Sequence, residues 1–294
     1  MLMSAKPDFG PMNPLVENLE ETGIVEVAQY GWDRQGLIPL WFGEGDLPTP
    51  AFITEAAADA MRRGETFYTD QRGILDLRKE IAAYMNRTFD IALDTDRVSL
   101  TTGGMSSLAM AMQMILEPGD EVLVIGPIWP NIYSTVEING GVSTHVSLSL
   151  RDDDWHLDMD ELFDACDGRT RAIFRERGIW IIADEVYHQL VFDRDVAPSF
   201  LQIAEDDDRL FVINSFSKSW MMTGWRLGWL THPAALGPTV AKLVQIVTSG
   251  VPQFLHRGAI VAMRDGDHVI KQLRARCLKG RDIVFDRLDA WPRI

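Results

Sequence analysis

The sequence of 294 residues is poor in cysteine and has no long apolar run. Its two cysteines, Cys166 and Cys277, provide neither a disulfide framework nor a metal cluster. No apolar run reaches the roughly 20 residues of a membrane-spanning helix, and the opening stretch MLMSAKPDFGPMNPL has no apolar core of signal-peptide length. These absences predict a cytoplasmic protein with no membrane partner.

Positive charge is also scarce in this chain. It has 28 lysine and arginine residues against 43 aspartate and glutamate residues, a formal net charge of -15. This excess of negative charge argues against a nucleic-acid-binding surface and against attraction to anionic lipids. Hydrophobic residues make up 46% of the chain, enough for a substantial core in one large domain or in a large and a small one.

Short apolar stretches predict the strands of an α/β fold. They lie at 97–102, 121–126, 170–174, 178–185 and 209–216. Continuous apolar runs, rather than alternating ones, are typical of a largely parallel sheet that is covered on both faces. An apolar helix is predicted at 106–120, between the first two strands, so that 97–126 would form one βαβ unit. We expect three layers, with helices on both sides of a mostly parallel sheet.

The junction between the third and fourth of these strands is too short. Only Arg175, Glu176, Arg177 and Gly178 lie between the apolar residues TRAIF of the third strand and IWIIAD of the fourth, whereas parallel neighbours need a crossover of about a dozen residues or more. We therefore expect a segment to be missing between Phe174 and Arg175. An intact mass near 33.1 kDa would contradict that expectation.

Two candidate functional residues follow the apolar run IWIIA. Asp184 lies at the carboxyl end of a predicted buried strand, the edge at which α/β sheets bind ligands. A carboxylate there needs a cationic partner, such as a protonated ring nitrogen. Tyr187 follows three residues later and could bond a ligand oxygen through its phenol. Taken alone, Asp184 is better explained as the cap of a following helix, and Tyr187 as a core tyrosine with its hydroxyl at the rim.

A second group of candidates follows the predicted strand 209–216. A lysine at the end of a buried strand, as at Lys218, can have a lowered pKa and act as a neutral amine nucleophile. Arg226 is suited to binding a phosphate, with Ser215 and Ser217 supplying hydroxyl groups. Taken alone, Lys218 is explained as a solvated surface lysine, and Arg226 as a surface arginine stacked on Trp225.

Two further features belong to the same predicted sheet. Gly103 and Gly104 allow backbone N–H groups to approach an anion at the start of the following helix. Trp129, in GPIWPN, follows the next strand and could stack on a planar ring. Each alone has a structural explanation, a tight turn or core packing. Together with the strand-end acid, tyrosine, lysine and arginine, they indicate a site for a planar, cationic, phosphorylated heterocycle, which is pyridoxal phosphate.

Six motifs then carry a family resemblance, from about Pro14 onward. SFSKSWMMTGWRLGW resembles the Schiff-base lysine signature of the class I/II aminotransferases, which have fold type I of the pyridoxal-phosphate enzymes. The other five are similar to further motifs of that family in its order: GEGDLPTP, FYTDQRGILDLRKEIA, TTGGMSSLAM, GPIWPN and ADEVY. The resemblance implies transfer of an amino group from an amino acid to a 2-oxo acid by a ping-pong mechanism.

The resemblance also implies residue roles. Lys218 would carry the cofactor and move the proton of the substrate α-carbon, Asp184 would keep the pyridine nitrogen protonated, and Tyr187 would bond the ring oxygen. Trp129 would stack on the ring and, with Gly43, line the substrate side. The phosphate contacts would come from Gly103, Gly104, Met105, Ser215, Ser217 and Arg226. Tyr68 would reach the phosphate of the other subunit, which implies a homodimer with shared active sites.

The family's domain plan, carried onto this sequence, gives three segments. Residues 1–45 would form an N-terminal arm and part of a small α/β domain, 46–257 the large cofactor-binding domain, and 258–294 the start of the C-terminal part of the small domain.

The chain departs from the family's pattern at three places. The Asn-Pro-Thr-Gly-type loop is absent and would fall at the short junction after Phe174. The arginine that binds the substrate α-carboxylate would lie beyond Ile294. The stretch Gln245–Ser249 contains no arginine for a distal carboxylate, which argues against narrow aspartate specificity.

Two other functions remain open at this stage. A β-eliminating C–S lyase would share every cofactor contact and differ only in its substrate contacts; release of pyruvate from cystathionine without an oxo-acid acceptor would favour it. A non-catalytic, pyridoxal-phosphate-sensing regulator would carry a DNA-binding module, of which this acidic sequence gives no sign; tight binding to a specific DNA would favour it.

Overall fold

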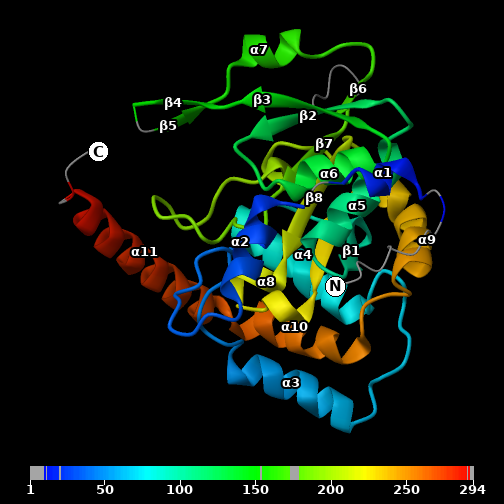
Figure 1. The fold of residues 1–294 in the computed structure, drawn as a ribbon. Coiled ribbons are helices and arrows are strands. Elements are labelled where there is room, and N and C mark those ends of the chain that lie inside the picture. Colours follow the sequence, from blue (N-terminus) through cyan, green and yellow to red (C-terminus); the bar gives the residue numbers. More distant parts are fainter. Residues whose placement is uncertain are drawn as a thin grey trace, which may run out of the picture. The chain divides into compact units, whose positions relative to one another are not determined.

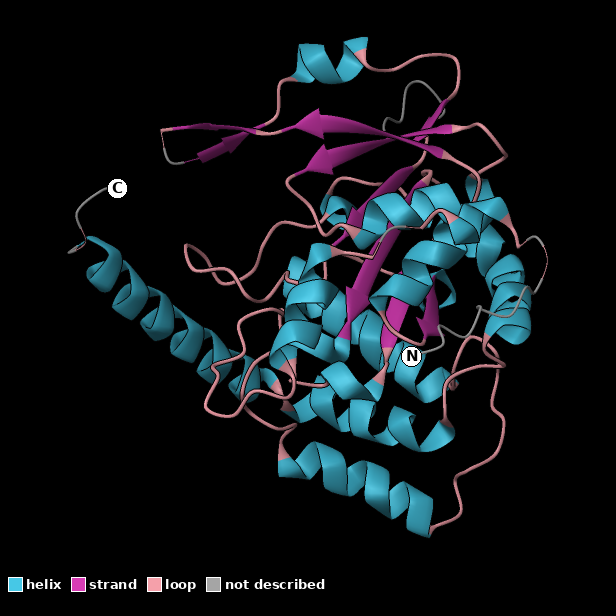
Figure 2. Ribbon diagram, viewed as in Figure 1, coloured by secondary structure: helices cyan, strands magenta, loops and turns pink. Residues whose placement is uncertain are grey.

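The computed structural model describes residues 10, 12–19, 21–152, 154–172, 179–289 and 291. The short junction after Phe174 lies outside these residues. Figures 1 and 2 show an α/β protein in which the described elements fall into two compact units. One unit comprises Met1–Phe42 and Met112–Ile173, and the other comprises Gly43–Ala111 and Phe174–Ile294. The domain bounds inferred from the sequence stay a prediction.

The first unit contains a sheet with strand order β3-β2-β6 and a small hairpin of β4 and β5. β2 is parallel to both of its neighbours, which agrees with the expected largely parallel pattern. Asp158 caps α7 by accepting hydrogen bonds from the backbone N–H groups of Asp160 and Glu161. The elements of this unit are α1 (Pro14–Glu17), α2 (Gly23–Gly31), β2 (Glu121–Gly126), α6 (Asn131–Ile138), β3 (Val142–Ser147), β4 (Ser149–Arg151), β5 (Asp154–His156), α7 (Met159–Asp164) and β6 (Thr170–Ala172).

The second unit contains a four-stranded sheet with strand order β1-β9-β8-β7. β7 and β8 are parallel, whereas β9 is antiparallel to both β8 and β1. The strands are β1 (Val98–Thr101), β7 (Ile181–Asp184), β8 (Leu210–Ser215) and β9 (Gly228–Thr231). Its helices are α3 (Ala51–Arg62), α4 (Leu75–Phe89), α8 (Phe216–Ser219), α9 (Gly237–Val247), α10 (Gln253–Asp265) and α11 (Asp267–Asp289), and α5 (Gly104–Ile115) runs from this unit into the other.

The predicted βαβ unit of 97–126 is wrong. Among the described residues, β1 pairs only with β9, while β2 pairs with β3 and β6, so that the two strands belong to different sheets. The sequence identified both strands because apolar runs are local, but the choice of neighbour depends on distant segments such as Gly228–Thr231.

Burial along β8 shows that its sheet is covered on both faces. All six residues of Leu210–Ser215 are buried. Leu210 and Val212 belong to the hydrophobic core, which also takes residues from α3, α4 and α10. On the opposite face, a Cβ added to Gly104 of α5 would lie 3.5 Å from Ile213 Cγ2. The second unit therefore has the expected three layers, helix, sheet and helix.

Among the described helices, none combines the length and the apolarity that a membrane crossing requires.

Gly228 allows a close approach of three backbone segments. A Cβ at this position would lie 2.8 Å from the Asn214 carbonyl oxygen and 3.0 Å from the Gly103 carbonyl carbon. Because these neighbours are backbone atoms of β8 and of the turn after β1, they cannot move aside without shifting the sheet.

We expect Gly228→Ala to destabilise the protein by about 1–3 kcal/mol, the usual effect of overpacking a buried position. Thermal or urea unfolding measures this change. Gly280→Ala is the control, because nothing lies within 4 Å of a Cβ at position 280 in α11. Alanine there should raise helix stability by roughly 0.5–1 kcal/mol. Equal stabilities for the two variants would contradict the close approach at Gly228.

Candidate active site

Lys218 lies in the single helical turn that follows β8. The Ser215 hydroxyl caps this turn by accepting a 3.1 Å hydrogen bond from the Ser217 N–H. Phe216 is fully buried in the core, which holds the turn against the sheet. From this position the Lys218 amine donates a 2.6 Å hydrogen bond to the Gly43 carbonyl. The lysine is thus an anchored, half-buried residue rather than a solvated surface group.

The surroundings of Lys218 favour its neutral form. Burial is the main cause that lowers the pKa of its amine, and the positive charge of Arg226 lowers it further. The carboxylates of Glu44 and Asp184 act in the opposite direction without cancelling the shift. A larger share of Lys218 is therefore available as a nucleophilic or proton-accepting amine near neutral pH than for an ordinary lysine.

Asp184 ends β7, one strand over from Lys218. Asp184 pairs with Ile213 in the parallel register, so both strands end at one edge of the sheet. Its carboxylate accepts a 3.2 Å hydrogen bond from the Val186 N–H. Part of the residue is exposed, but the protein atoms around the carboxyl group reduce its hydration, and this burial raises its pKa. The nearby Lys218 charge works against this rise. A cation bound beside Asp184 would favour the ionised carboxylate.

Tyr187 completes this side of the cluster. Its ring centroid lies 5.6 Å from Lys218 Nζ. Burial raises the pKa of its phenol, and the Asp184 charge adds to this shift, so the hydroxyl stays protonated and can donate a hydrogen bond. A Cβ on Gly43 would overlap the Tyr187 hydroxyl and lie 3.6 Å from Lys218 Nζ. Only glycine fits at position 43 in this arrangement.

A second part of the cluster has the character of an anion site. Gly103 has φ +107°, a conformation that side chains disfavour, and a Cβ on it would lie 2.5 Å from Arg226 Nη2. Arg226 donates a 2.7 Å hydrogen bond to the Thr223 carbonyl and forms no ion pair with any residue that the structure describes. Its positive charge is therefore available to a ligand beside the start of α5.

Two buried hydroxyl groups adjoin this arginine-bearing segment. Ser215 Oγ lies 2.8 Å from Ser217 Oγ and 3.2 Å from the Leu227 carbonyl. A Cβ on Gly104 would lie 3.9 Å from the Ser215 Cβ, which places the first turn of α5 beside the end of β8. The Arg226 guanidinium, the hydroxyls of Ser215 and Ser217 and the first backbone N–H groups of the 12-residue α5 are together a set of hydrogen-bond donors suited to phosphate.

The residues present thus fit pyridoxal phosphate. The hydrogen-bond donors around the start of α5 suit its phosphate, and the Asp184 carboxylate suits its ring nitrogen. The Tyr187 hydroxyl suits its ring oxygen, and the Lys218 amine suits its carbonyl group. Across the described part of the chain, no group of three or more His, Cys, Asp or Glu residues is arranged to hold a metal ion.

Three of the predicted site residues are less constrained by the structure. Tyr68 is 86% exposed in the loop between α3 and α4. Met105 lies in the first turn of α5. Trp129 belongs to the other compact unit and is 39% exposed, so its stacking role stays a prediction.

The sequence did not single out the residues that fix the loop after Lys218. Thr49 Oγ1 donates a 2.6 Å hydrogen bond to the Met221 carbonyl and accepts a 2.9 Å hydrogen bond from Trp225 Nε1. The Thr223 hydroxyl donates to the Glu44 carboxylate. Glu44 and Thr49 stand in GEGDLPTP, but no local pattern could pair them with residues more than 170 positions away.

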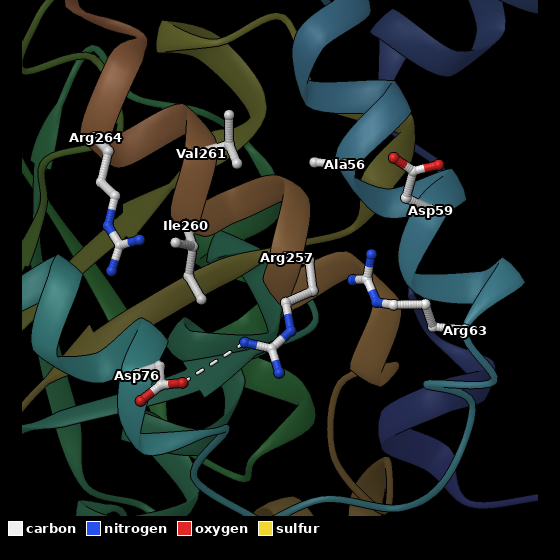
Figure 3. Close-up of a pocket in the computed structure, with 8 residues that line it drawn as sticks. All are labelled: Ala56, Asp59, Arg63, Asp76, Arg257, Ile260, Val261 and Arg264. Carbon is white, nitrogen blue, oxygen red and sulfur yellow. Dashed lines mark ion pairs between the residues drawn. The ribbon is translucent and has the colours of Figure 1, made fainter.

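A surface pocket of about 370 Å³ shares no residue with this cluster. It lies among α3, α4 and α10, and its lining residues are Ala56, Asp59, Arg63, Asp76, Arg257, Ile260, Val261 and Arg264 (Figure 3). Its arginines already have acidic partners: Arg63 and Arg257 contact Glu65, and Arg264 contacts Glu80. Because the positive charges of these arginines are balanced by acidic partners, the pocket has no excess charge with which to hold an ion.

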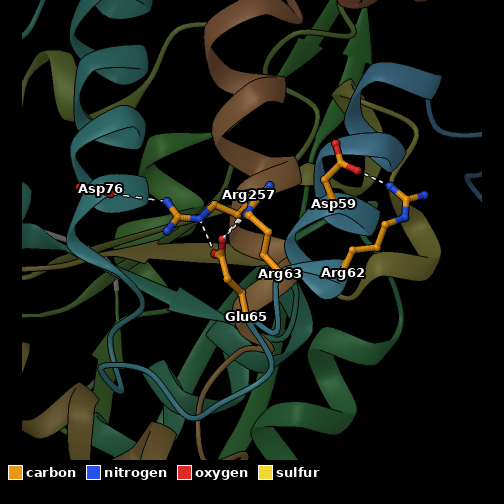
Figure 4. A network of polar contacts seen from close by, with 6 residues as sticks. All are labelled: Asp59, Arg62, Arg63, Glu65, Asp76 and Arg257. Atoms are coloured by element: carbon orange, nitrogen blue, oxygen red, sulfur yellow. Dashed lines mark hydrogen bonds and ion pairs between the residues drawn. The ribbon is translucent and has the colours of Figure 1, made fainter.

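Arg257 in this network connects the two ends of the loop that carries Tyr68. It contacts Glu65 at 2.6 Å, just after α3, and Asp76 at 3.6 Å, in the first turn of α4 (Figure 4). Gln253 Oε1, one turn earlier on α10, accepts a 3.4 Å hydrogen bond from the Phe67 N–H. α10 thus restrains the Tyr68 loop at both ends.

Comparison with known proteins agrees with this chemistry. The family model "Aminotransferase class I and II" matches residues 38–174 and 169–293. A relative from Thermotoga maritima, named aspartate aminotransferase, is 30% identical, and the alignment covers 86% of this chain and 72% of the relative. A relative from Bacillus subtilis, named probable N-acetyl-LL-diaminopimelate aminotransferase, is 28% identical, with coverage of 94% and 76%.

A solved structure shares the fold. The aspartate aminotransferase from Rhizobium meliloti matches with a TM-score of 0.87 and 26% sequence identity. The match covers 96% of this chain and 78% of that chain.

We expect Arg257→Met to loosen the Tyr68 loop, because one side chain holds Glu65 and Asp76 together. Hydrogen–deuterium exchange of residues 66–74 should become faster. Arg62→Met is the matched control: it removes an ion pair with Asp59 that lies within α3. Unchanged exchange in the Arg257 variant, or an equal change in the control, would contradict the bridging role.

Proposed function

Because the chain belongs to the class I and II aminotransferase family, we propose that the Lys218 cluster is its pyridoxal-phosphate site. The family transfers amino groups from amino acids to 2-oxo acids. The observation that supports the assignment is that Asp184 and Tyr187 both lie near the Lys218 amine, which donates a hydrogen bond to the Gly43 carbonyl.

Bound pyridoxal phosphate supplies an electron-accepting ring that stabilises negative charge on a substrate carbon. Asp184 would hold the protonated ring nitrogen, and Tyr187 would donate its phenolic proton to the ring oxygen. Trp129 would stack on the ring. The phosphate would be held by the residues around the start of α5 and the end of β8, namely Gly103, Gly104, Met105, Ser215, Ser217 and Arg226.

Lys218 is the proton carrier of the proposed site. Its Nζ, once released from the Gly43 carbonyl, accepts the proton of the substrate α-carbon and can return it to a neighbouring carbon. The lowered pKa of the amine keeps a proton-accepting fraction available near neutral pH. Gly43 lines the substrate side, where its lack of a side chain lets the Tyr187 hydroxyl and the Lys218 amine approach the main chain closely.

The substrates proposed are an amino acid and a 2-oxo acid, without restriction to aspartate. The two curated relatives carry different substrate names, aspartate and N-acetyl-LL-diaminopimelate. In the stretch Gln245–Ser249, the side chains of Ile246 and Val247 are exposed, and no arginine is present. This stretch offers no charged partner for a second carboxylate.

We further propose a homodimer, located in the cytoplasm. Tyr68 and its neighbour Phe67 are 86% and 77% exposed, on a loop restrained by α10. Two aromatic side chains presented in this way favour insertion into a partner subunit. Tyr68 would then contact the phosphate of the other subunit.

We also propose that the relatives contain residues between β6 and β7 that have no counterpart in this chain. The family match is split into two parts that meet at 169–174. The alignment to the Bacillus subtilis relative spans 302 positions, more than the 294 residues of the chain. The split match supports the missing segment inferred from the short junction.

A lyase of the same fold would use the same cofactor contacts. The similar proteins named here are aminotransferases, and no comparison favours β-elimination. Amino-group transfer requires an oxo-acid acceptor, whereas β-elimination from cystathionine releases pyruvate without one.

The first test combines the half-reaction with a lysine substitution. The protein loaded with pyridoxal phosphate should change its visible absorption with an amino acid and recover it with a 2-oxo acid. Lys218→Ala should lose both this cycle and the borohydride-reducible covalent link to the cofactor. Lys242→Ala, at an exposed position of α9, should keep them. A link that persists in Lys218→Ala would refute the lysine assignment.

The second test concerns the phosphate site. Arg226→Ala should weaken cofactor binding by a factor of about 10–150, since a hydrogen-bonded charge contributes roughly 1.5–3 kcal/mol. Arg226→Lys should give an intermediate value, because it keeps the charge but loses the paired donors. Equilibrium dialysis measures both. An unchanged dissociation constant in the alanine variant would count against the phosphate role.

A further inference from the structure

One carbonyl group gathers several hydrogen bonds within the turn that carries Asp184 and Tyr187. The Glu185 carbonyl lies between the two residues and accepts three hydrogen bonds. They come from His188 N–H at 3.1 Å, His188 Nδ1 at 2.8 Å and Asn214 Nδ2 at 3.2 Å. Since the turn lies beyond the end of β7, no sheet pairing fixes it after the Glu185 N–H, which donates to the Ile213 carbonyl.

The hydrogen bonds of His188 define its tautomer. A carbonyl oxygen only accepts, so Nδ1 must carry the proton that is donated to Glu185. Nε2 is then the acceptor of the Tyr84 hydroxyl at 2.8 Å. Gln189 Nε2 donates to the same hydroxyl at 2.7 Å. The imidazole is 2% exposed, and its burial lowers its pKa to about 4, so that it stays neutral.

Tyr84 links this histidine to the Lys218 turn. The Tyr84 ring contacts His188 edge-on at 6.0 Å between centroids and Trp220 edge-on at 5.4 Å. Trp220 is fully buried and lies two residues after Lys218. Tyr84 itself belongs to the long helix α4. One rigid aromatic group thus contacts both turns, the one with Asp184 and Tyr187 and the one with Lys218.

We propose that His188 is a positioning residue: through the Glu185 carbonyl, it fixes the turn of Asp184 and Tyr187 relative to Lys218. The proposal rests on the proposed function, because it assigns cofactor contacts to those residues. It predicts that the bond from the δ nitrogen matters for cofactor binding, whereas the bond to the ε nitrogen matters mainly for stability.

Two substitutions at position 188 separate these bonds. In His188→Asn, the side-chain amide can occupy the place of Nδ1 and still donate to the Glu185 carbonyl. In His188→Gln, the amide reaches the place of Nε2 and leaves the δ position without a donor. Tyr84→Phe is the matched control, since it removes the bond to Nε2 but keeps the ring that contacts Trp220.

The measurements are the dissociation constant of pyridoxal phosphate, the melting temperature and the amide exchange of residues 185–188 in the cofactor-free chain. All three variants should melt below the wild type, because each disturbs a buried polar group. His188→Gln should bind the cofactor about tenfold more weakly, which is the effect of losing one hydrogen bond. In this variant, the amide hydrogens of residues 185–188 should also exchange faster. His188→Asn and Tyr84→Phe should stay within about threefold of the wild type.

Two results would overturn the proposal. One is that His188→Gln binds the cofactor with the same affinity as the wild type and exchanges the amides of residues 185–188 at the same rate. The other is an equal loss of affinity in all three variants, which would make His188 merely a stabilising residue. A wild type that does not bind pyridoxal phosphate would reject the proposed function instead, and the exchange of residues 185–188 would still decide whether His188 holds the turn.

Discussion

The parallel pairing of β7 with β8 is the constraint on which the candidate site depends. This register aligns Ile181 with Leu210 and Asp184 with Ile213, so the two strands end at the same edge of the sheet. A shift by one residue would exchange the two faces of β7 and turn Asp184 away. The core residues of β8 resist such a shift, because Leu210 and Val212 are buried against α4 and α10. Core packing thus sets the position of the acidic group.

Much of the cluster could be predicted because its members stand at the ends of apolar runs. Asp184 and Ser215 are the last residues of β7 and β8, and Lys218 follows β8. Both strands show in the sequence as continuous hydrophobic segments. Gly103 could be predicted for a related reason, since a glycine pair between a strand and a helix is a local signal. Each residue type also suggested its chemistry, and the structure brings these residues to the same sheet edge.

The partners that restrain the cluster could not be predicted in the same way. Glu44 and Thr49 contact the segment 221–225, and Tyr84 contacts His188, across more than 100 residues of sequence in each case. Periodicity identifies Tyr84 as a buried residue of α4 but gives no information on what its hydroxyl meets. The error in the predicted βαβ unit has the same origin: β1 was identified correctly, but its neighbour β9 begins more than a hundred residues later.

The contact between Lys218 and Gly43 involves a main-chain oxygen. Its acceptor is therefore the same whatever side chain stands at a neighbouring position, and a scan of side-chain substitutions would not reveal it. At position 43 itself, residue type is restricted by the space beside Tyr187, because a Cβ there would overlap the Tyr187 hydroxyl as it now lies. The side chains that hold the stretch WFGEGDLPTP in place stand at other positions of it, where Glu44 and Thr49 contact the segment 221–225. A hydrogen bond donated to this oxygen uses an N–H of the amine rather than its lone pair, so the contact orients the nitrogen without occupying the electrons that would bind a carbonyl compound.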